Sequence, residues 1–191
     1  MFPTWSPAAR HNRIKRALSN REIIRLTRGL YCFSENYQRH GLNLFEIGNR
    51  IEFPSYVSLE SALRHYKLIP EAVIGSTLVT PNRSKEIETP LGVFSFKHLP
   101  LRIFQRDFLR KKEGASSFLI ATPMKALLDL IYLQQKNYKS LGDLEEDLRL
   151  NLEQLKIELR DISNKNLVAY KSLYSRPRVS SVIDLIIWEL L

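Results

Sequence analysis

The segment from Thr122 to Leu133 constrains the fold most, because it predicts a helix that is apolar on both sides. Thr122-Pro123 has the form of an N-cap residue followed by proline at the first helical position. At about 100° per residue the apolar side chains fall on two faces: Met124, Leu127, Leu128 and Ile131 on one, Leu130 and Leu133 on the other. Such a helix must be covered by protein on both sides, so we predict that it is central and buried.

Short strand patterns precede this helix in the sequence. We expect strands at AVIGSTLVT (72–80), KEIE (85–88), GVFSFKHL (92–99) and FLIA (118–121). In GVFSFKHL, Phe94, Phe96 and His98 alternate with Ser95 and Lys97, as in a half-buried strand. The intervening Thr89-Pro90-Leu91-Gly92 suits a type I turn.

Further helices are expected before and after these strands in the sequence. The residues SYVSLESALRHYKLI (55–69) predict one helix, capped by Ser55 or Ser58, and GLNLFEIGNR (41–50) a connecting helix or loop. The C-terminal part predicts helices at 143–150, 152–162 and 179–190, with a break at Arg176-Pro177. With 191 residues, of which 44% are hydrophobic, the chain can build a substantial core, and we predict an α+β fold.

The N-terminal residues predict a basic helix followed by a hairpin. Ser6-Pro7 suits a helix start, and the helix is expected to end near Ser19-Asn20. The runs REIIRLT and LYCFS then flank Arg28-Gly29, where glycine supplies the positive φ of a tight turn. A basic helix directly followed by a hairpin is the order at the end of a winged helix-turn-helix, in which the helix enters the major groove.

The positive charge is concentrated in the same region. The chain has a net charge of +9, and residues 1–30 hold seven basic side chains against one acidic, a net of +6. Such a concentration is the footprint of a phosphate-binding element, and the alternative is a basic face kept for solubility. Acidic residues dominate 143–161, which predicts a solvated helix face or a contact for a basic partner.

The sequence offers little catalytic chemistry. The seven glycines are too far apart for a phosphate-cradling loop, the four histidines form no metal-binding pair, and no carboxylate lies two residues before a lysine as in many nucleases. Cys32, the only cysteine, is expected to be a packed thiol, which excludes an intrachain disulfide and favours a reducing compartment. We expect a soluble cytoplasmic protein with no enzymatic activity, cofactor, metal, membrane span or secretory signal.

Four segments in the same order resemble the AbiEi-type antitoxins of bacterial abortive-infection systems. They are IIRLTRGLY, YVSLESALRHYKLIPE, VTPNRS with TPLGVFSFKHLP, and ATPMKALLDLIYL, and they lie within about residues 20 to 135. The resemblance implies a winged-helix DNA-binding region joined to an α/β antitoxin domain with C-terminal helices. It also implies a protein that represses its own toxin–antitoxin operon and neutralises a nucleotidyltransferase toxin.

The chain departs from the family pattern in two places. Met124 stands where the family often has glutamate, in TPEKALLD. A winged helix also places two supporting helices before its recognition helix, whereas five residues precede Ser6 here. We therefore expect a partial winged-helix element at 1–36, followed by the antitoxin domain at 37–191. Either the start of this element is truncated, or its helix docks elsewhere, on the antitoxin domain, on a second copy or on the toxin.

The resemblance and the basic helix together indicate which residues contact promoter DNA. We expect these to be Asn12, Arg13, Lys15 and Arg16 on the helix, with Arg25 and Arg28 on the wing. Arg64, Lys67 and Lys125 are candidates for toxin contacts. The alternatives are a stand-alone nucleic-acid-binding regulator without a toxin and a degenerate nuclease.

Overall fold

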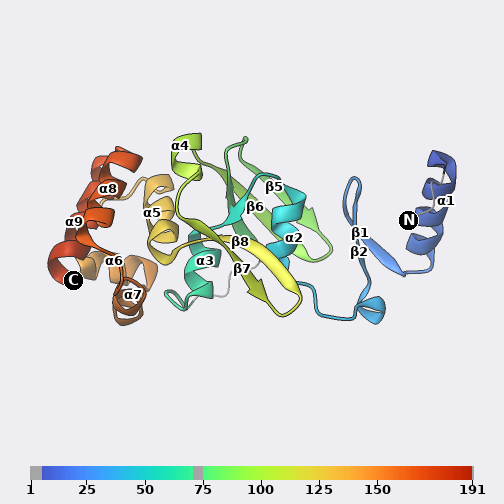
Figure 1. The fold of residues 1–191 in the computed structure, drawn as a ribbon, viewed down its shortest axis with the longest axis horizontal. Helices are drawn as coiled ribbons and strands as arrows, with labels where there is room; N and C mark the ends of the chain where they lie inside the picture. Colours follow the sequence, from blue (N-terminus) through green and yellow to red (C-terminus); the bar gives the residue numbers. More distant parts are fainter. Residues whose placement is uncertain (1–5, 71–74, 191) are drawn as a thin grey trace.

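The computed structural model of the protein describes residues 6–70 and 75–190. Within these ranges the fold is α+β, with a mixed six-stranded sheet, a separate two-stranded sheet, and helices before, between and after the strands. In Figure 1 the N-terminal helix and hairpin lie at one end of the long axis, the six-stranded sheet in the middle, and the C-terminal helices at the other end. The α+β class predicted from the sequence is confirmed.

The large sheet has the strand order β5-β6-β4-β3-β8-β7. Two hairpins form its edges, where β5 pairs antiparallel with β6 and β7 with β8. In the centre, β4 runs parallel to β6 and antiparallel to β3, and β3 runs parallel to β8. The strands are β3 (Tyr56–Val57), β4 (Ser76–Thr80), β5 (Lys85–Thr89), β6 (Gly92–His98), β7 (Phe108–Glu113) and β8 (Ser116–Ala121).

Four of these strands were predicted, although their bounds differ. β4 begins at Ser76 within the predicted 72–80 segment, of which residues 72–74 lie outside the described part of the chain. In β6 the side chains of Phe94 and Phe96 are buried, as their alternation predicted, whereas His98 at the end of the strand is exposed.

Three helices pack around the sheet. They are α2 (Leu44–Ile51), α3 (Leu59–His65) and α5 (Pro123–Leu133). α2 crosses β4 so closely that a Cβ at Gly48 would lie 2.9 Å from both methyl groups of Leu78, so a larger residue there would force the Leu78 side chain to shift. α5 contacts α3 and α9, and every residue from Met124 to Ile131 is buried. The prediction of a central, covered helix at this position is confirmed.

The helix predicted over 55–69 is wrong in its first residues. Tyr56 and Val57 form β3, which pairs with β4 and β8 in the middle of the sheet. The helix begins only at Leu59, and the Ser58 hydroxyl donates to the buried Asp129 carboxylate instead of capping it. Pairing on both edges thus outweighs the helical periodicity of the segment.

Three elements of the fold were not predicted. α4 (Leu101–Phe104) and β7 follow β6, and α8 (Asn164–Tyr174) lies between the expected second and third C-terminal helices. The C-terminal part therefore contains α6 (Leu141–Leu148), α7 (Leu152–Glu158), α8 and α9 (Pro177–Leu185), with a π-helical turn at Ile186–Leu190. β7 is a basic edge strand that pairs only with β8, and such charge at an edge opposes pairing with other chains.

The N-terminal elements follow the prediction. α1 (Pro7–Ser19) precedes β1 (Ile23–Thr27) and β2 (Leu30–Phe33), which form the two-stranded sheet, and a short 3₁₀ helix follows at Glu35–Tyr37. Among the described residues, no helix combines the length and the apolar character that crossing a membrane requires.

Candidate nucleic-acid interface

α1 is capped at both ends by local hydrogen bonds and has no buried face. The Ser6 hydroxyl accepts a hydrogen bond from the Ala9 backbone N–H at 3.2 Å, and Pro7 occupies the first helical position. At the other end Arg21 takes a left-handed φ of 55°, and the Glu22 N–H donates to the Ala17 carbonyl at 2.9 Å. No residue of α1 is buried, so the helix presents most of its surface to solvent.

The hairpin connects α1 to the rest of the protein. Its turn contains Gly29 with φ +84°, as the sequence predicted. A bulge between Arg25 and Thr27 contains Leu26, which is 6% exposed and belongs to the core. Ile24, Leu30 and Cys32 are partly buried against the same core, so one face of the hairpin packs on the body of the protein.

Arg25 lies on the opposite face of the hairpin. Side chains alternate along a strand, so Arg25 points away from its core-packed neighbour Ile24, and it is exposed. Its Nε donates to the Thr27 carbonyl at 3.3 Å. Arg28 is exposed at the turn itself. The hairpin therefore has a packed side and a basic outer side.

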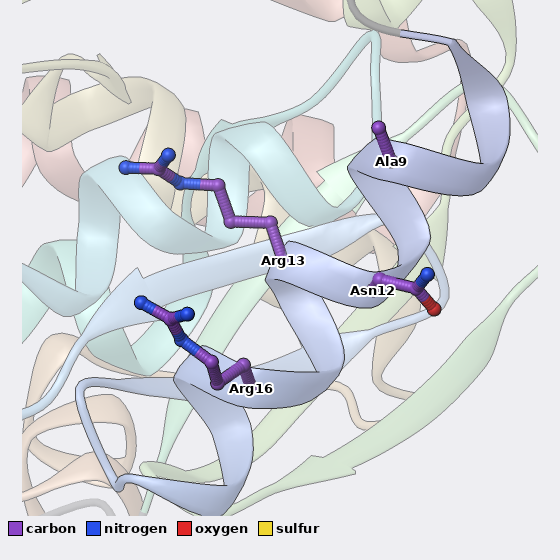
Figure 2. Close-up of a pocket in the computed structure, with 4 residues that line it drawn as sticks. All are labelled: Ala9, Asn12, Arg13 and Arg16. Carbon is purple, nitrogen blue, oxygen red and sulfur yellow. The ribbon is translucent and has the colours of Figure 1, made fainter.

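The residues predicted to contact DNA are all exposed. Two of them, Arg13 and Arg16, extend on the same side of α1 one turn apart, whereas Asn12 points away from them (Figure 2). With Ala9, these three residues line a shallow hollow of about 350 Å³. Lys15 is exposed elsewhere on the helix. Arg13 and Arg16 are thus brought together as a pair of guanidinium groups.

Arg25 and Arg28 of the hairpin do not line that hollow. Arg25 lines a different one, of about 520 Å³, between the end of α1, the base of the hairpin and the β5–β6 turn. Arg21 lines the same hollow and was not among the predicted site residues. The left-handed conformation of Arg21 at the end of α1 places its side chain in this hollow. In the sequence, the only indication of this placement was that the helix was expected to end near Ser19-Asn20.

Several of these cations are available to a ligand. Within residues 6–70 and 75–190, Lys15, Arg16 and Arg28 form no ion pair. Glu22, the only acidic residue among the first 30, instead accepts a hydrogen bond from the Asn20 amide at 2.9 Å. The positive charge of this end of the molecule is therefore not neutralised locally.

A second polar cluster, which the sequence reasoning missed, lies inside the body. The Asp129 carboxylate pairs with Lys125 and accepts hydrogen bonds from the hydroxyls of Tyr174, Ser58 and Tyr56 at 2.7, 2.8 and 3.3 Å. The Lys125 ammonium also lies 5.4 Å from the ring centroids of both tyrosines. The spacing of Lys125 and Asp129, four residues apart in an apolar helix, was the one signal in the sequence.

This cluster is a structural network rather than an accessible site. Lys125 and Asp129 are each 0% exposed, so the expectation that Lys125 contacts a toxin is wrong. Burial lowers the pKa of Lys125, and the Asp129 carboxylate opposes this shift. Burial also raises the pKa of Tyr174, followed by the effect of Asp129, so its hydroxyl remains a donor. The network ties β3, α5 and α8 together.

The two other residues expected to contact a toxin lie in or directly after α3. Lys67 is exposed at the end of α3, and Arg64 is partly buried. In the part of the chain that the structure describes, no group of three or more His, Cys, Asp or Glu side chains could hold a metal ion. Cys32 is partly buried, and burial raises the pKa of its thiol, as expected of a packed side chain.

Comparison with known proteins adds no relative to this description. No protein-family model matches the chain, and no curated protein matches it.

Proposed function

We propose that the protein is a non-enzymatic antitoxin and autoregulator of a toxin–antitoxin operon. In this proposal α1 acts as the recognition helix and the β1–β2 hairpin as the wing on promoter DNA. The sheet and the C-terminal helices then form the part that neutralises a nucleotidyltransferase toxin. The DNA half is carried by one observation, the exposed basic residues on a helix that buries none of its side chains.

The chemistry of the exposed residues suits the phosphate backbone. Arginine guanidinium groups bind phosphate oxygens with two parallel hydrogen bonds, and Arg13 and Arg16 lie on one side of α1. Contacts of this kind position a protein on DNA, whereas an amide such as that of Asn12 can read an adenine edge in the major groove. A helix that contributed to the core instead would show a buried apolar stripe, which α1 lacks.

Charge reversal on α1 tests the DNA half. We expect Arg13→Glu/Arg16→Glu to weaken binding to the promoter of its own operon by at least about tenfold, because two phosphate contacts become repulsive. Fluorescence anisotropy with a labelled promoter fragment measures this affinity. Unchanged affinity in this variant would refute the proposed role of α1.

A matched control separates this effect from a general loss of charge. Arg83→Glu/Lys156→Glu reverses two exposed basic residues on the body that have no ion-pair or hydrogen-bond partner among the described residues. We expect this control to bind the promoter within about twofold of the wild type, since the contacts that matter lie on α1. An equal loss in both variants would show that only the net charge matters.

Co-expression tests the antitoxin half, which depends on the resemblance. A nucleotidyltransferase toxin encoded beside the gene should arrest growth alone, and expression of this protein should restore it. Failure to rescue growth would refute the proposed antitoxin activity. DNA binding without rescue would instead favour the stand-alone regulator, and metal-dependent cleavage of DNA by the purified protein would favour the nuclease.

A further inference from the structure

A groove of about 620 Å³ lies far from α1, between the β-sheet and the C-terminal helices. One wall is formed by α4 and the turn that leads into β7, and the other by α8, which lies next to α4 in Figure 1. This volume falls in the range of about 300–1,000 Å³ that small-molecule sites occupy. Its lining includes Arg102, Arg106, Tyr170, Ile162, Ala169 and Leu173.

One wall of this groove belongs to the most basic segment of the body, and it carries Arg102, Arg106 and the acidic Asp107. Residues 101–113 hold five basic side chains against two acidic, a net of +3. In 31–100 there are seven of each sign, and in 114–191 ten of each. The whole net charge outside the first 30 residues therefore comes from the segment that contains Arg102 and Arg106.

These two arginines are free to bind an anion. Both are exposed, and neither has a hydrogen-bond or ion-pair partner within the described residues. The neighbouring carboxylate of Asp107 lies near the Tyr170 hydroxyl, and burial followed by this carboxylate raises the pKa of Tyr170. Two unpaired guanidinium groups on one wall favour a phosphate, which accepts hydrogen bonds from both.

The wall that carries the arginines is fixed in position. Asp107 takes a left-handed φ of 54°, and its carbonyl accepts a hydrogen bond from the Thr122 N–H at 2.9 Å. Thr122 in turn caps α5, the most deeply buried helix of the described chain. The backbone of the loop with Arg106 is thus anchored to the core, so binding an anion there orders the arginine side chains but not the loop itself.

The opposite wall carries three apolar side chains beside polar ones such as Asn166 and Ser172, and it suits a different part of a ligand. Ile162, Ala169 and Leu173 line it, on α8 and just before it. A ligand that fits both walls must combine an anionic group with a flat or apolar body, and inorganic phosphate alone would leave most of the volume empty. We propose that this groove binds a mononucleotide, with its phosphates on Arg102 and Arg106 and its base against Ile162 and Leu173. The proposal is independent of DNA binding by α1 and of a toxin.

Calorimetric titration of the full chain with ATP, in EDTA, tests the proposal. We expect saturable binding of ATP, and binding of adenosine weaker by at least about tenfold because it lacks the phosphates. Arg102→Ala/Arg106→Ala should weaken ATP binding by a similar factor. The control Arg83→Ala/Lys156→Ala should leave it within about twofold, since these residues lie outside the groove.

A second variant blocks the groove without changing its charge. Ala169 is exposed on α8, so Ala169→Trp fills the groove with little effect on the fold, which thermal unfolding verifies. We expect this variant to lose ATP binding and to keep the wild-type melting temperature. Retention of ATP binding by a folded Ala169→Trp protein would overturn the proposal.

Four other results would also overturn it. Absence of ATP and GTP binding to the wild type removes the site, and an equal loss in the control variant reduces it to bulk charge. Tripolyphosphate that binds as tightly as ATP removes the role of the apolar side chains. A single-stranded oligonucleotide that binds through Arg102 and Arg106 when ATP does not would assign the groove to nucleic acid.

Discussion

The helices α1 and α5 begin with the same local device and have opposite environments. Ser6-Pro7 starts the first and Thr122-Pro123 the second, each with a hydroxyl that accepts a backbone N–H. α1 buries none of its 13 residues, whereas α5 buries eight consecutive ones. Capping therefore sets where a helix starts, and the side chains that follow decide whether it becomes a surface or a core.

The positively charged side chains of the two helices also lie in different environments. Arg13 and Arg16 of α1 lie exposed in a shallow hollow, whereas Lys125 of α5 is fully buried and paired with Asp129. A buried cation requires a partner because desolvation disfavours its charged form. Substitutions in α5 should therefore change stability, and substitutions in α1 should change binding.

Removal of the buried carboxylate should have the largest effect on stability. We expect Asp129→Ala to lower the free energy of unfolding by about 3–5 kcal/mol, because it leaves the Lys125 ammonium and three hydroxyl groups without their acceptor. Urea unfolding followed by circular dichroism measures this change. The control Asp161→Ala, at an exposed position, should stay within about 0.5 kcal/mol. A loss below about 1 kcal/mol for Asp129→Ala would contradict the network.

Truncation of one apolar side chain in each helix compares them directly. Leu127 is 0% exposed, so Leu127→Ala should cost about 2–5 kcal/mol through lost burial and the cavity that it leaves. Ile14 on α1 is only partly buried, so Ile14→Ala should cost less than about 1 kcal/mol. Equal losses in the same urea unfolding measurement would show that α1 is part of the core after all.

A smaller effect is expected from pH at the end of α3. The Nε2 atom of His65 lies 2.6 Å from the Lys111 ammonium and 3.6 Å from a Glu113 carboxylate oxygen. Burial, and then Lys111, lower the pKa of His65, while Glu113 and Glu158 oppose the shift. The unfolded chain therefore binds more protons than the folded one below the ordinary histidine pKa of 6.5.

The free energy of unfolding should consequently fall as the pH decreases through 6.5, by no more than about 1.4 kcal/mol per pH unit for this one group. Chemical unfolding at about pH 7.5, 6.5 and 5.5 measures the slope above the range in which carboxylates titrate. His65→Gln should flatten it. A slope in the variant equal to that of the wild type would assign the dependence to another group.

The predictable parts of the fold are those with strong local signals. The N-cap and proline at residues 6 and 7, the glycine at 29 and the two-sided apolar pattern after Thr122 indicated α1, the hairpin and α5. β3 was assigned to a helix, because its two residues become a strand only by pairing with β4 and β8. Such pairing depends on segments distant in the sequence.

The same reasoning applies to the missed helix and to the sites. α8 contacts the core mainly through Leu167, Tyr170 and Tyr174. Because most of the residues between them are exposed or polar, the sequence of α8 shows no clear helical spacing of apolar side chains. The basic character of α1 was evident from the sequence, but the separation of Arg25 from the Arg13 and Arg16 pair was not. The partners of Lys125 come from three elements, so its burial could be known only from the tertiary structure.

The salt dependence of promoter binding tests most directly whether α1 contacts the phosphate backbone. Each phosphate contact contributes about −0.9 to the slope of log K against log salt, because it releases condensed counterions. We predict that Arg13→Glu/Arg16→Glu reduces the magnitude of the slope by about 2 relative to the wild type, while Arg83→Glu/Lys156→Glu leaves it unchanged. A slope in the α1 variant equal to that of the wild type would contradict the proposal that this helix binds DNA.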